Sequence, residues 1–164
     1  MNTRIGQPET VTRSRHATAV AAGGHGLLIT GPSGSGKSTL ALEMMALGAA
    51  LICDDQVMLT RRGNRIIASA PNGAPALIEA RGIGLIPVAE LAQPTPLSLI
   101  IDLGIEEGDR LPPARVASLL GVGIRSLRKP AHLVPAALFL ALQAGGPLNA
   151  DSHAVRIEGH IKRN

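Results

Sequence analysis

The chain has 164 residues, which is enough for one domain with a complete core and too few for two ordinary domains. Hydrophobic residues make up 45% and charged residues 17%, but the only aromatic residue is one Phe, so rings for base stacking are lacking. The net charge of +4 comes from short, scattered basic groups, and we therefore expect no nucleic-acid partner. With one Cys, no signal peptide and no apolar run near the length of about 18 residues that a membrane span needs, we expect a cytoplasmic protein without membrane association.

The first 14 residues are polar and without a pattern, which predicts a flexible arm or an edge segment. A strand over residues 16–21, the turn Gly23-Gly24-His25-Gly26 and a strand over residues 27–30 predict a hairpin. The turn brings His16 back toward the segment after Thr30. A lone His is either a structural residue or part of a site.

Residues 31–38 fit the phosphate-loop pattern G-x-x-x-x-G-K-[ST], with an apolar strand before them and a helix after them that we expect to end at Gly48. Backbone N–H groups of such a loop and of the helix N-terminus hold phosphate, Lys37 adds a positive charge, and Ser38 offers a hydroxyl to Mg²⁺. The predicted nucleotide-binding residues are Gly31, Pro32, Ser33, Gly34, Ser35, Gly36, Lys37, Ser38 and Thr39.

Two apolar runs end in acidic residues. The run over residues 49–53 has the composition of a strand covered on both faces and delivers Asp54 and Asp55 at its C-terminal end, where open α/β sheets bind their ligands. The run over residues 97–101 ends at Asp102 and has the pattern of a Walker B strand. Periodicity alone leaves the choice between the Asp pair and Asp102 open, and a turn-forming Asp pair is the simpler alternative.

Residues 56–70 predict a peripheral hairpin around Gly63-Asn64, and residues 92–96 a linker. In the segment 77–84, Glu79 and Arg81 stand beside two glycines, which favour a backbone that approaches another group closely. The acid and base alone would be only an exposed ion pair. The remaining elements expected are a turn over 108–113, a strand over 122–127, a helix over 131–144 with Pro135 in its first turn, and a polar tail over 145–164 that contains His153 and His160.

Four motifs together resemble the HPr kinase/phosphorylase family, bacterial enzymes that phosphorylate a serine of the phosphocarrier protein HPr. They are Arg15-His16, the run over residues 28–38, Cys53-Asp54-Asp55 and the run over residues 78–84. The resemblance covers about residues 15–130. It implies an α/β P-loop domain of the HPr kinase/PEP carboxykinase type, with a central mixed sheet and flanking helices. The catalytic domain would span residues 15–144, between the arm (1–14) and the tail (145–164).

The resemblance also implies roles for single residues. Lys37 would contact the β- and γ-phosphates of ATP, with Ser38 and Glu79 as Mg²⁺ ligands. Asp55 matches the proton acceptor for the serine hydroxyl, with Asp54 in support, and His16 matches a histidine near the γ-phosphate. The catalytic arginines would be Arg81 and Arg110, and Asp102 would belong to the core.

The implied partner is an HPr-like phosphocarrier, with inorganic phosphate as the substrate of the reverse reaction and a homo-oligomer, a hexamer in the family, as the assembly. The resemblance is to a short form of the family with the catalytic domain only, which we expect to be without the extra N-terminal domain of longer members. Position 39 holds Thr where an acid is usual. The family segment linked to dephosphorylation is diverged here at residues 124–130, which favours the kinase over the phosphorylase. Two alternatives stay open: a small-molecule or nucleotide kinase, and an ATP-binding regulatory module that transfers no phosphate.

Overall fold

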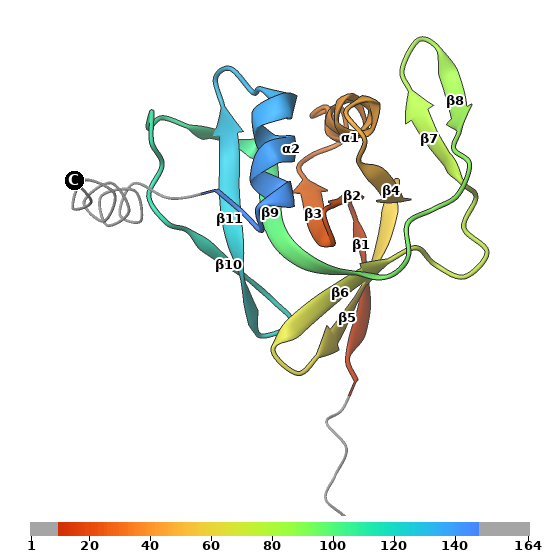
Figure 1. Cartoon of the computed structure of the whole chain (residues 1–164), viewed down its shortest axis with the longest axis horizontal. Helices are drawn as coiled ribbons and strands as arrows, with labels where there is room; N and C mark the ends of the chain where they lie inside the picture. Colours follow the sequence, from red (N-terminus) through yellow and green to blue (C-terminus); the bar gives the residue numbers. More distant parts are fainter. Residues whose placement is uncertain (1–9, 148–164) are drawn as a thin grey trace, which may run out of the picture.

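The computed structural model describes residues 10–147, which form a nine-stranded mixed sheet, a separate two-stranded hairpin and two helices (Figure 1). The strands are β1 (Thr12–His16), β2 (Thr18–Ala22), β3 (His25–Thr30), β4 (Ala50–Cys53), β5 (Gln56–Arg62), β6 (Arg65–Ser69), β7 (Leu77–Ala80), β8 (Gly84–Pro87), β9 (Thr95–Glu107), β10 (Val116–Leu119) and β11 (Val122–Pro130). The helices are α1 (Lys37–Ala46) and α2 (Pro135–Gln143).

The predicted N-terminal hairpin is confirmed as β2 and β3, which pair antiparallel, but His16 is not part of it. His16 ends the preceding strand, β1, which pairs with β5 and places His16 opposite Gln56. Residues 12–14, which we expected in the flexible arm, also belong to β1. The correction has a physical reason, because β1 is stabilised by a partner strand about 40 residues away, and local sequence carries no sign of that partner.

Strand β9 is the longest of the sheet and pairs with three others. It runs parallel to β3 and β11 and antiparallel to β6. Two expectations are corrected here: the strand continues beyond Asp102 to Glu107, and the end of the predicted linker, Thr95 and Pro96, is its beginning. The hairpin of β5 and β6 is not peripheral either, because β6 pairs with β9 and β5 with β1. Strand β10 was not predicted.

Both predicted helices are present on one face of the sheet (Figure 1). Helix α1 has its C-cap at Leu47 and is followed by Gly48 with a φ of 109°, a conformation that Gly adopts without strain. Helix α2 begins at Pro135, where the missing N–H costs no hydrogen bond. Neither these helices nor any other in residues 10–147 is long and apolar enough to cross a membrane.

The core is aliphatic, as the composition requires, and lies on both faces of the sheet. Alternate residues of the central strands divide between two clusters: Leu27 and Ile29 of β3 pack toward the helices, while Leu28 packs on the opposite face. From the helices, Leu40, Met44, Leu138 and Leu142 complete the first cluster, and Ile52, Val57, Leu59 and Ile66 belong to the second. Because β3 is buried on both faces, the phosphate loop that follows it starts from a fixed base.

Candidate active site

A pocket of about 490 Å³ opens where the phosphate loop, the N-terminus of α1, the end of β4 and the β7–β8 hairpin meet. Eleven of the residues singled out in the sequence line it: His16, Ser33, Gly34, Gly36, Lys37, Ser38, Thr39, Asp54, Asp55, Glu79 and Arg81. Asp102 and Arg110 are not among its lining residues. The topology explains the meeting: β2 is antiparallel to both β3 and β4, so the carboxyl ends of β3 and β4 lie at the same edge of the sheet.

The phosphate loop has the backbone that anion binding requires. Gly34 and Gly36 have φ angles of 79° and 95°, which turn backbone N–H groups toward the inside of the loop and which other residues adopt only with strain. Gly36 is the N-cap of α1 and supplies no side-chain cap, so the first N–H groups of the helix face the pocket without an internal partner. These features fit a phosphate group.

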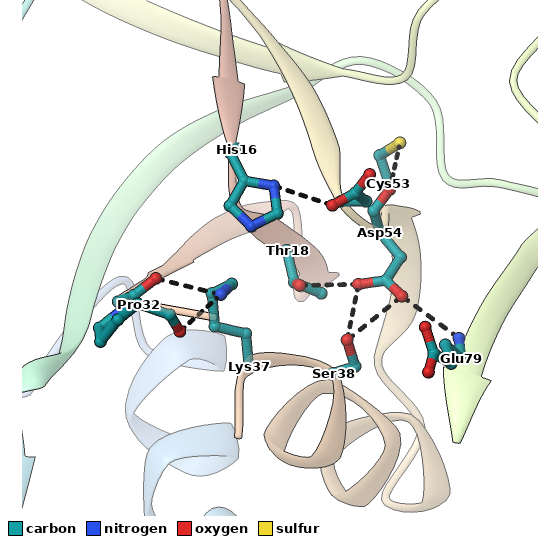
Figure 2. A network of polar contacts seen from close by, with 10 residues as sticks. His16, Thr18, Pro32, Lys37, Ser38, Cys53, Asp54 and Glu79 are labelled. Carbon is teal, nitrogen blue, oxygen red and sulfur yellow. Dashed lines mark hydrogen bonds and ion pairs between the residues drawn. The ribbon is translucent and has the colours of Figure 1, made fainter. Parts of the chain in front are cut away.

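Lys37 and Ser35 test this fit further. Lys37 is buried, and its Nζ donates to the carbonyl oxygens of Gly31 and Pro32 at 3.0 and 3.1 Å, so one of its three N–H groups has no partner within residues 10–147 (Figure 2). Ser35 Oγ is also buried and has no partner in the described part of the chain. A β-carbon at Gly31 would lie 2.7 Å from that oxygen, so position 31 requires glycine.

The carboxylate of Asp54 is the centre of a hydrogen-bond network (Figure 2). Its Oδ1 accepts from Thr18 Oγ1 at 2.7 Å and from Ser38 Oγ at 2.9 Å, and its Oδ2 accepts from the backbone N–H of Glu79 at 3.3 Å. Three separate elements, β2, α1 and β7, therefore fix one carboxylate. Sequence reasoning missed Thr18; the available signal was a hydroxyl residue at the start of the apolar strand Thr18–Ala22.

Asp55 points away from this network and pairs with His16. His16 Nδ1 lies 2.8 Å from Asp55 Oδ1, and the two side chains are 60% and 78% exposed. Asp55 has a φ of 72°, which is uncommon for a residue with a side chain but is tolerated by Asp. This left-handed conformation lets two successive carboxylates take different places, Asp54 inside against Ser38 and Asp55 at the solvent-facing mouth of the pocket.

The described part of the chain does not hold a Mg²⁺ site made of protein ligands alone. Within residues 10–147 no group of three or more His, Cys, Asp or Glu side chains could hold a metal ion. Mg²⁺ in nucleotide sites is usually held by one or two carboxylates together with phosphate oxygens. The oxygens of Ser38, Asp54 and Glu79 fit that arrangement, since all three residues line the pocket. The Asp54 carboxylate also accepts from Ser38 Oγ and from the backbone N–H of Glu79.

Arg81 reaches from the β7–β8 hairpin to the phosphate loop. Its Nη2 atom would lie 3.8 Å from a β-carbon built on Gly34. We expected Gly82 and Gly84 to allow another group to approach the backbone closely, but their backbone angles explain them instead. Gly82 and Gly84 have φ angles of 81° and 133°, and a β-carbon at either would meet nothing within 4 Å. They lie at the turn between β7 and β8, and no described residue would come within 4 Å of a β-carbon there.

Arg110 is exposed and belongs to the segment between β9 and β10. This segment lies on the far side of α2 from the β7–β8 hairpin (Figure 1). Ion pairs hold this segment, since Arg115 contacts both Glu107 and Asp109. The pKa of Glu107 is lowered because the backbone N–H of Asp109 donates to its carboxylate and because Arg115 lies against it. The structure therefore does not bring Arg110 to the pocket of its own chain, and its catalytic role stays a prediction.

Asp102, the competitor of the Asp pair, is half-buried, and its Oδ1 accepts from the backbone N–H of Gly104 at 2.8 Å. A β-carbon at Gly104 would lie 2.9 Å from Cδ of Pro32, so this part of β9 packs directly under the phosphate loop. Asp102 thus shapes the strand that supports the loop. Asp54 and Asp55 line the pocket and Asp102 does not, so the Asp pair stays the candidate.

Comparisons with known proteins agree with this arrangement. The family model of the HPr Serine kinase C-terminal domain matches residues 9–107. An HPr kinase/phosphorylase of Mycoplasmopsis pulmonis (strain UAB CTIP) is 47% identical over 73 residues, 44% of this chain and 24% of the relative. That of Latilactobacillus sakei subsp. sakei (strain 23K) is 42% identical over 98 residues, 56% of this chain and 31% of the relative.

Among solved structures, the Hpr(Ser) kinase/phosphatase from Coxiella burnetii matches with a TM-score of 0.68 and 26% identity, over 90% of this chain and 99% of that chain. The predicted α/β fold of the HPr kinase type is confirmed. The chain spans about a quarter to a third of the length of the two curated relatives. Arg110 and the diverged segment 124–130 lie outside the residues that the family model matches.

Proposed function

Because this chain belongs to the HPr serine kinase C-terminal domain family, we propose that it transfers the γ-phosphoryl group of ATP to a serine hydroxyl of an HPr-like phosphocarrier protein. One observation carries the proposal: the pocket sets two carboxylates with different surroundings opposite a phosphate loop, Asp54 bound to Ser38 and Asp55 exposed at the mouth. Phosphoryl transfer needs positioning, charge neutralisation and a base, and these residues can supply all three.

Bound ATP and Mg²⁺ would supply the phosphoryl group and neutralise part of its charge. Residues 31–39, apart from Pro32, would bind the phosphates through backbone N–H groups, and Lys37 would donate its remaining N–H to a phosphate oxygen. Ser38, Asp54 and Glu79 present oxygens to the metal ion. Arg81, which reaches toward Gly34, adds positive charge beside the oxygens of the transferred group.

Asp55 accepts the proton of the serine hydroxyl while the serine oxygen forms its bond to phosphorus and the bond to the ADP oxygen breaks. Its exposure allows a hydroxyl on another protein to reach it. His16 contacts only Oδ1 of Asp55, and no described residue makes a hydrogen bond or ion pair with Oδ2. His16 orients Asp55, and with inorganic phosphate the same groups would run the reverse reaction, in which Asp55 returns the proton to the serine oxygen.

The test is to incubate the full chain with Mg²⁺, labelled ATP and purified HPr, and to locate the label by mass spectrometry. Phosphoserine on HPr is the expected result. Asp55→Asn should leave nucleotide binding intact and lower transfer by about 10²- to 10⁴-fold, the usual contribution of a general base. A second incubation of phosphoserine-HPr with inorganic phosphate tests the reverse activity.

Asp102→Asn is the matched control, because Asn keeps an oxygen that can accept from Gly104. If transfer survives in Asp55→Asn but is lost in Asp102→Asn, the assignment of the base is wrong. Label on a small molecule instead of HPr would support the small-molecule kinase, and nucleotide binding with no transfer to any acceptor would support the regulatory module.

The partner and setting follow from the same proposal. The enzyme would act in the cytoplasm on its phosphocarrier, as a homo-oligomer, with a hexamer as the assembly to test by light scattering. The transfer assay is repeated with two arginine variants. Arg81→Ala should lower transfer in every assembly state. A loss of transfer in Arg110→Ala, with fold and assembly unchanged, would support a role of this arginine at the pocket of another chain.

A further inference from the structure

Strand β1 forms one end of the nine-stranded sheet and pairs with β5 alone among the described strands (Figure 1). All five of its residues are exposed. The strand at the other end of this order, β4, is covered, because the backbone N–H of Ala92 donates to the carbonyl oxygen of Leu51 at 2.6 Å. Proteins often close an edge with a Pro or a bulge, but β1 contains no Pro and its register with β5 has no shift. Within residues 10–147, neither a strand nor a bulge closes the free side of β1, which we call the open edge.

The hydrogen bonds to β5 show which backbone groups face the open edge. The backbone N–H of Arg61 donates to the carbonyl oxygen of Val11 at 2.9 Å. In an antiparallel pair, residues that bond to the partner strand alternate with residues that do not. Counting from Val11, the backbone groups of Arg13 and Arg15 therefore point to β5. The groups that point to the open edge are those of Thr12, Ser14 and His16.

The side chains of Arg13 and Arg15 make the open edge basic. The two residues are two positions apart, so their side chains lie on the same face of β1, about 7 Å apart along the strand. Neither makes an ion pair within residues 10–147. The strands β1, β5 and β6 carry two, two and one Arg, and none of them carries Asp or Glu. The two guanidinium groups on β1 therefore lack a carboxylate partner in this part of the sheet.

The open edge and its charge together decide what fits. A second copy of β1 offers no carboxylate to the arginines and adds two positive charges. A nucleic acid offers phosphates but no row of alternating N–H and C=O groups, and a membrane surface would need large apolar side chains, which β1 lacks. An extended polypeptide with a carboxylate at every second position satisfies both features, because its carboxylates also repeat at about 7 Å.

We propose that the open edge of β1 binds an extended acidic segment of a second protein by strand addition. The backbone of the segment pairs with Thr12, Ser14 and His16, and its carboxylates lie opposite Arg13 and Arg15. Of these five residues only His16 lines the pocket, so the surface is separate from the phosphate site and from the acceptor of the proposed function. The inference does not depend on phosphoryl transfer.

The experiment measures binding of a fluorescent peptide of alternating Glu and Thr to the full chain by anisotropy. Replacing both arginines, in Arg13→Gln/Arg15→Gln, should raise the dissociation constant about fivefold at low salt, because two cross-strand charge pairs are lost. Arg62→Gln/Arg65→Gln is the matched control: it removes the same charge from the far end of the β5–β6 hairpin and should change the constant less than twofold.

Three further peptides test the geometry. Glu opposite Arg13 and Arg15 places the N–H groups of the Thr residues toward β1 and those of the Glu residues away from it. N-methylation of the Thr residues should therefore abolish binding, whereas N-methylation of the Glu residues should be tolerated. A peptide of the same composition with all Glu residues before all Thr residues should bind about fivefold more weakly, because its carboxylates no longer repeat on one face.

Binding that depends on both arginines, on the alternation and on the Thr N–H groups supports the proposal, even if the chain transfers no phosphate to HPr. An alternating peptide that does not bind, or an equal loss in the Arg62→Gln/Arg65→Gln control, overturns it, since the attraction would then come from net charge alone. Equal binding of the peptide with N-methylated Thr also overturns strand addition. Tighter binding of a thymidine oligonucleotide of the same charge would assign the edge to nucleic acid, and displacement of the peptide by purified HPr would assign it to the acceptor; either result overturns a separate acidic partner.

Discussion

The replacement Thr18→Val tests whether the network around Asp54 controls catalysis. Thr18 is fully buried, and its hydroxyl donates to Asp54 Oδ1 at 2.7 Å. Val has nearly the same shape, so the main change is the loss of one hydrogen bond to a charged acceptor, about 1.5–3 kcal/mol of the free energy of unfolding. For a chain of this length, that lowers the melting temperature by roughly 3–12 °C.

At a temperature where Thr18→Val is still folded, its rate of phosphoryl transfer should fall by more than its loss of stability explains. Asp54 keeps its contacts with Ser38 and the backbone of Glu79 but loses the donor from β2. Loss of a group that orients a metal-site carboxylate typically costs about 10- to 100-fold in metal affinity or activity. Unfolding is followed by circular dichroism, because the chain has no Trp, and transfer is measured across a Mg²⁺ titration.

Thr18→Ser is the matched control, since it keeps the hydroxyl and loses only a methyl group. It should retain most of the transfer while losing about 1 kcal/mol of stability. If Thr18→Val transfers phosphate at the original rate and with the original Mg²⁺ dependence, the hydrogen bond does not position Asp54. If the Ser variant is as inactive as the Val variant, packing rather than the hydroxyl is responsible.

Three further predictions follow from other parts of the molecule. Gly104→Ala should weaken nucleotide binding with the fold retained, because its β-carbon would lie 2.9 Å from Cδ of Pro32, whereas Gly108→Ala, with nothing within 4 Å, should not. Because the pKa of Glu107 is lowered from 4.5, its contribution to stability is present above that pH and is lost as the pH falls below it. In Glu107→Gln the free energy of unfolding should therefore fall less steeply with decreasing pH. An equal fall in both chains would refute the stabilising role of the Glu107 carboxylate. Burial raises the pKa of the Cys53 thiol, so a thiol reagent at about pH 8 should modify it slowly in the folded chain and rapidly in urea, and fast modification of the folded chain would contradict its burial.

The parts of the site that sequence could predict are those fixed by neighbouring residues. The phosphate loop and α1 are continuous in the chain, so spacing alone places Lys37 and Ser38. The position of Asp54 and Asp55 after an apolar strand could also be predicted from the sequence, because ligands of open α/β sheets bind at the C-terminal ends of the strands. That Asp54 and Asp55 line the pocket while Asp102 does not is visible only in the tertiary structure.

The parts that sequence could not predict depend on distant partners. Strand β1 exists because β5 pairs with it, and one residue, Ala17, separates it from β2. Thr18 gave no sign of its role, because its acceptor is 36 residues away. Arg110 was placed by the resemblance alone, in a segment where this chain has its own ion pairs. The tail with His153 and His160 lies outside the described residues, except for residues 145–147.

The pairing of β9 sets the order in which the site can form. The hairpins β2–β3 and β5–β6 join strands that are neighbours in the chain, so their strand pairing forms quickly. The parallel pairing of β3 with β9 joins residues about 70 positions apart, and such contacts form slowly. A nascent chain that has not reached residue 107 would contain the entire phosphate-loop sequence but not the strand on which Pro32 rests. We expect nucleotide binding to appear only after β9 has paired with β3.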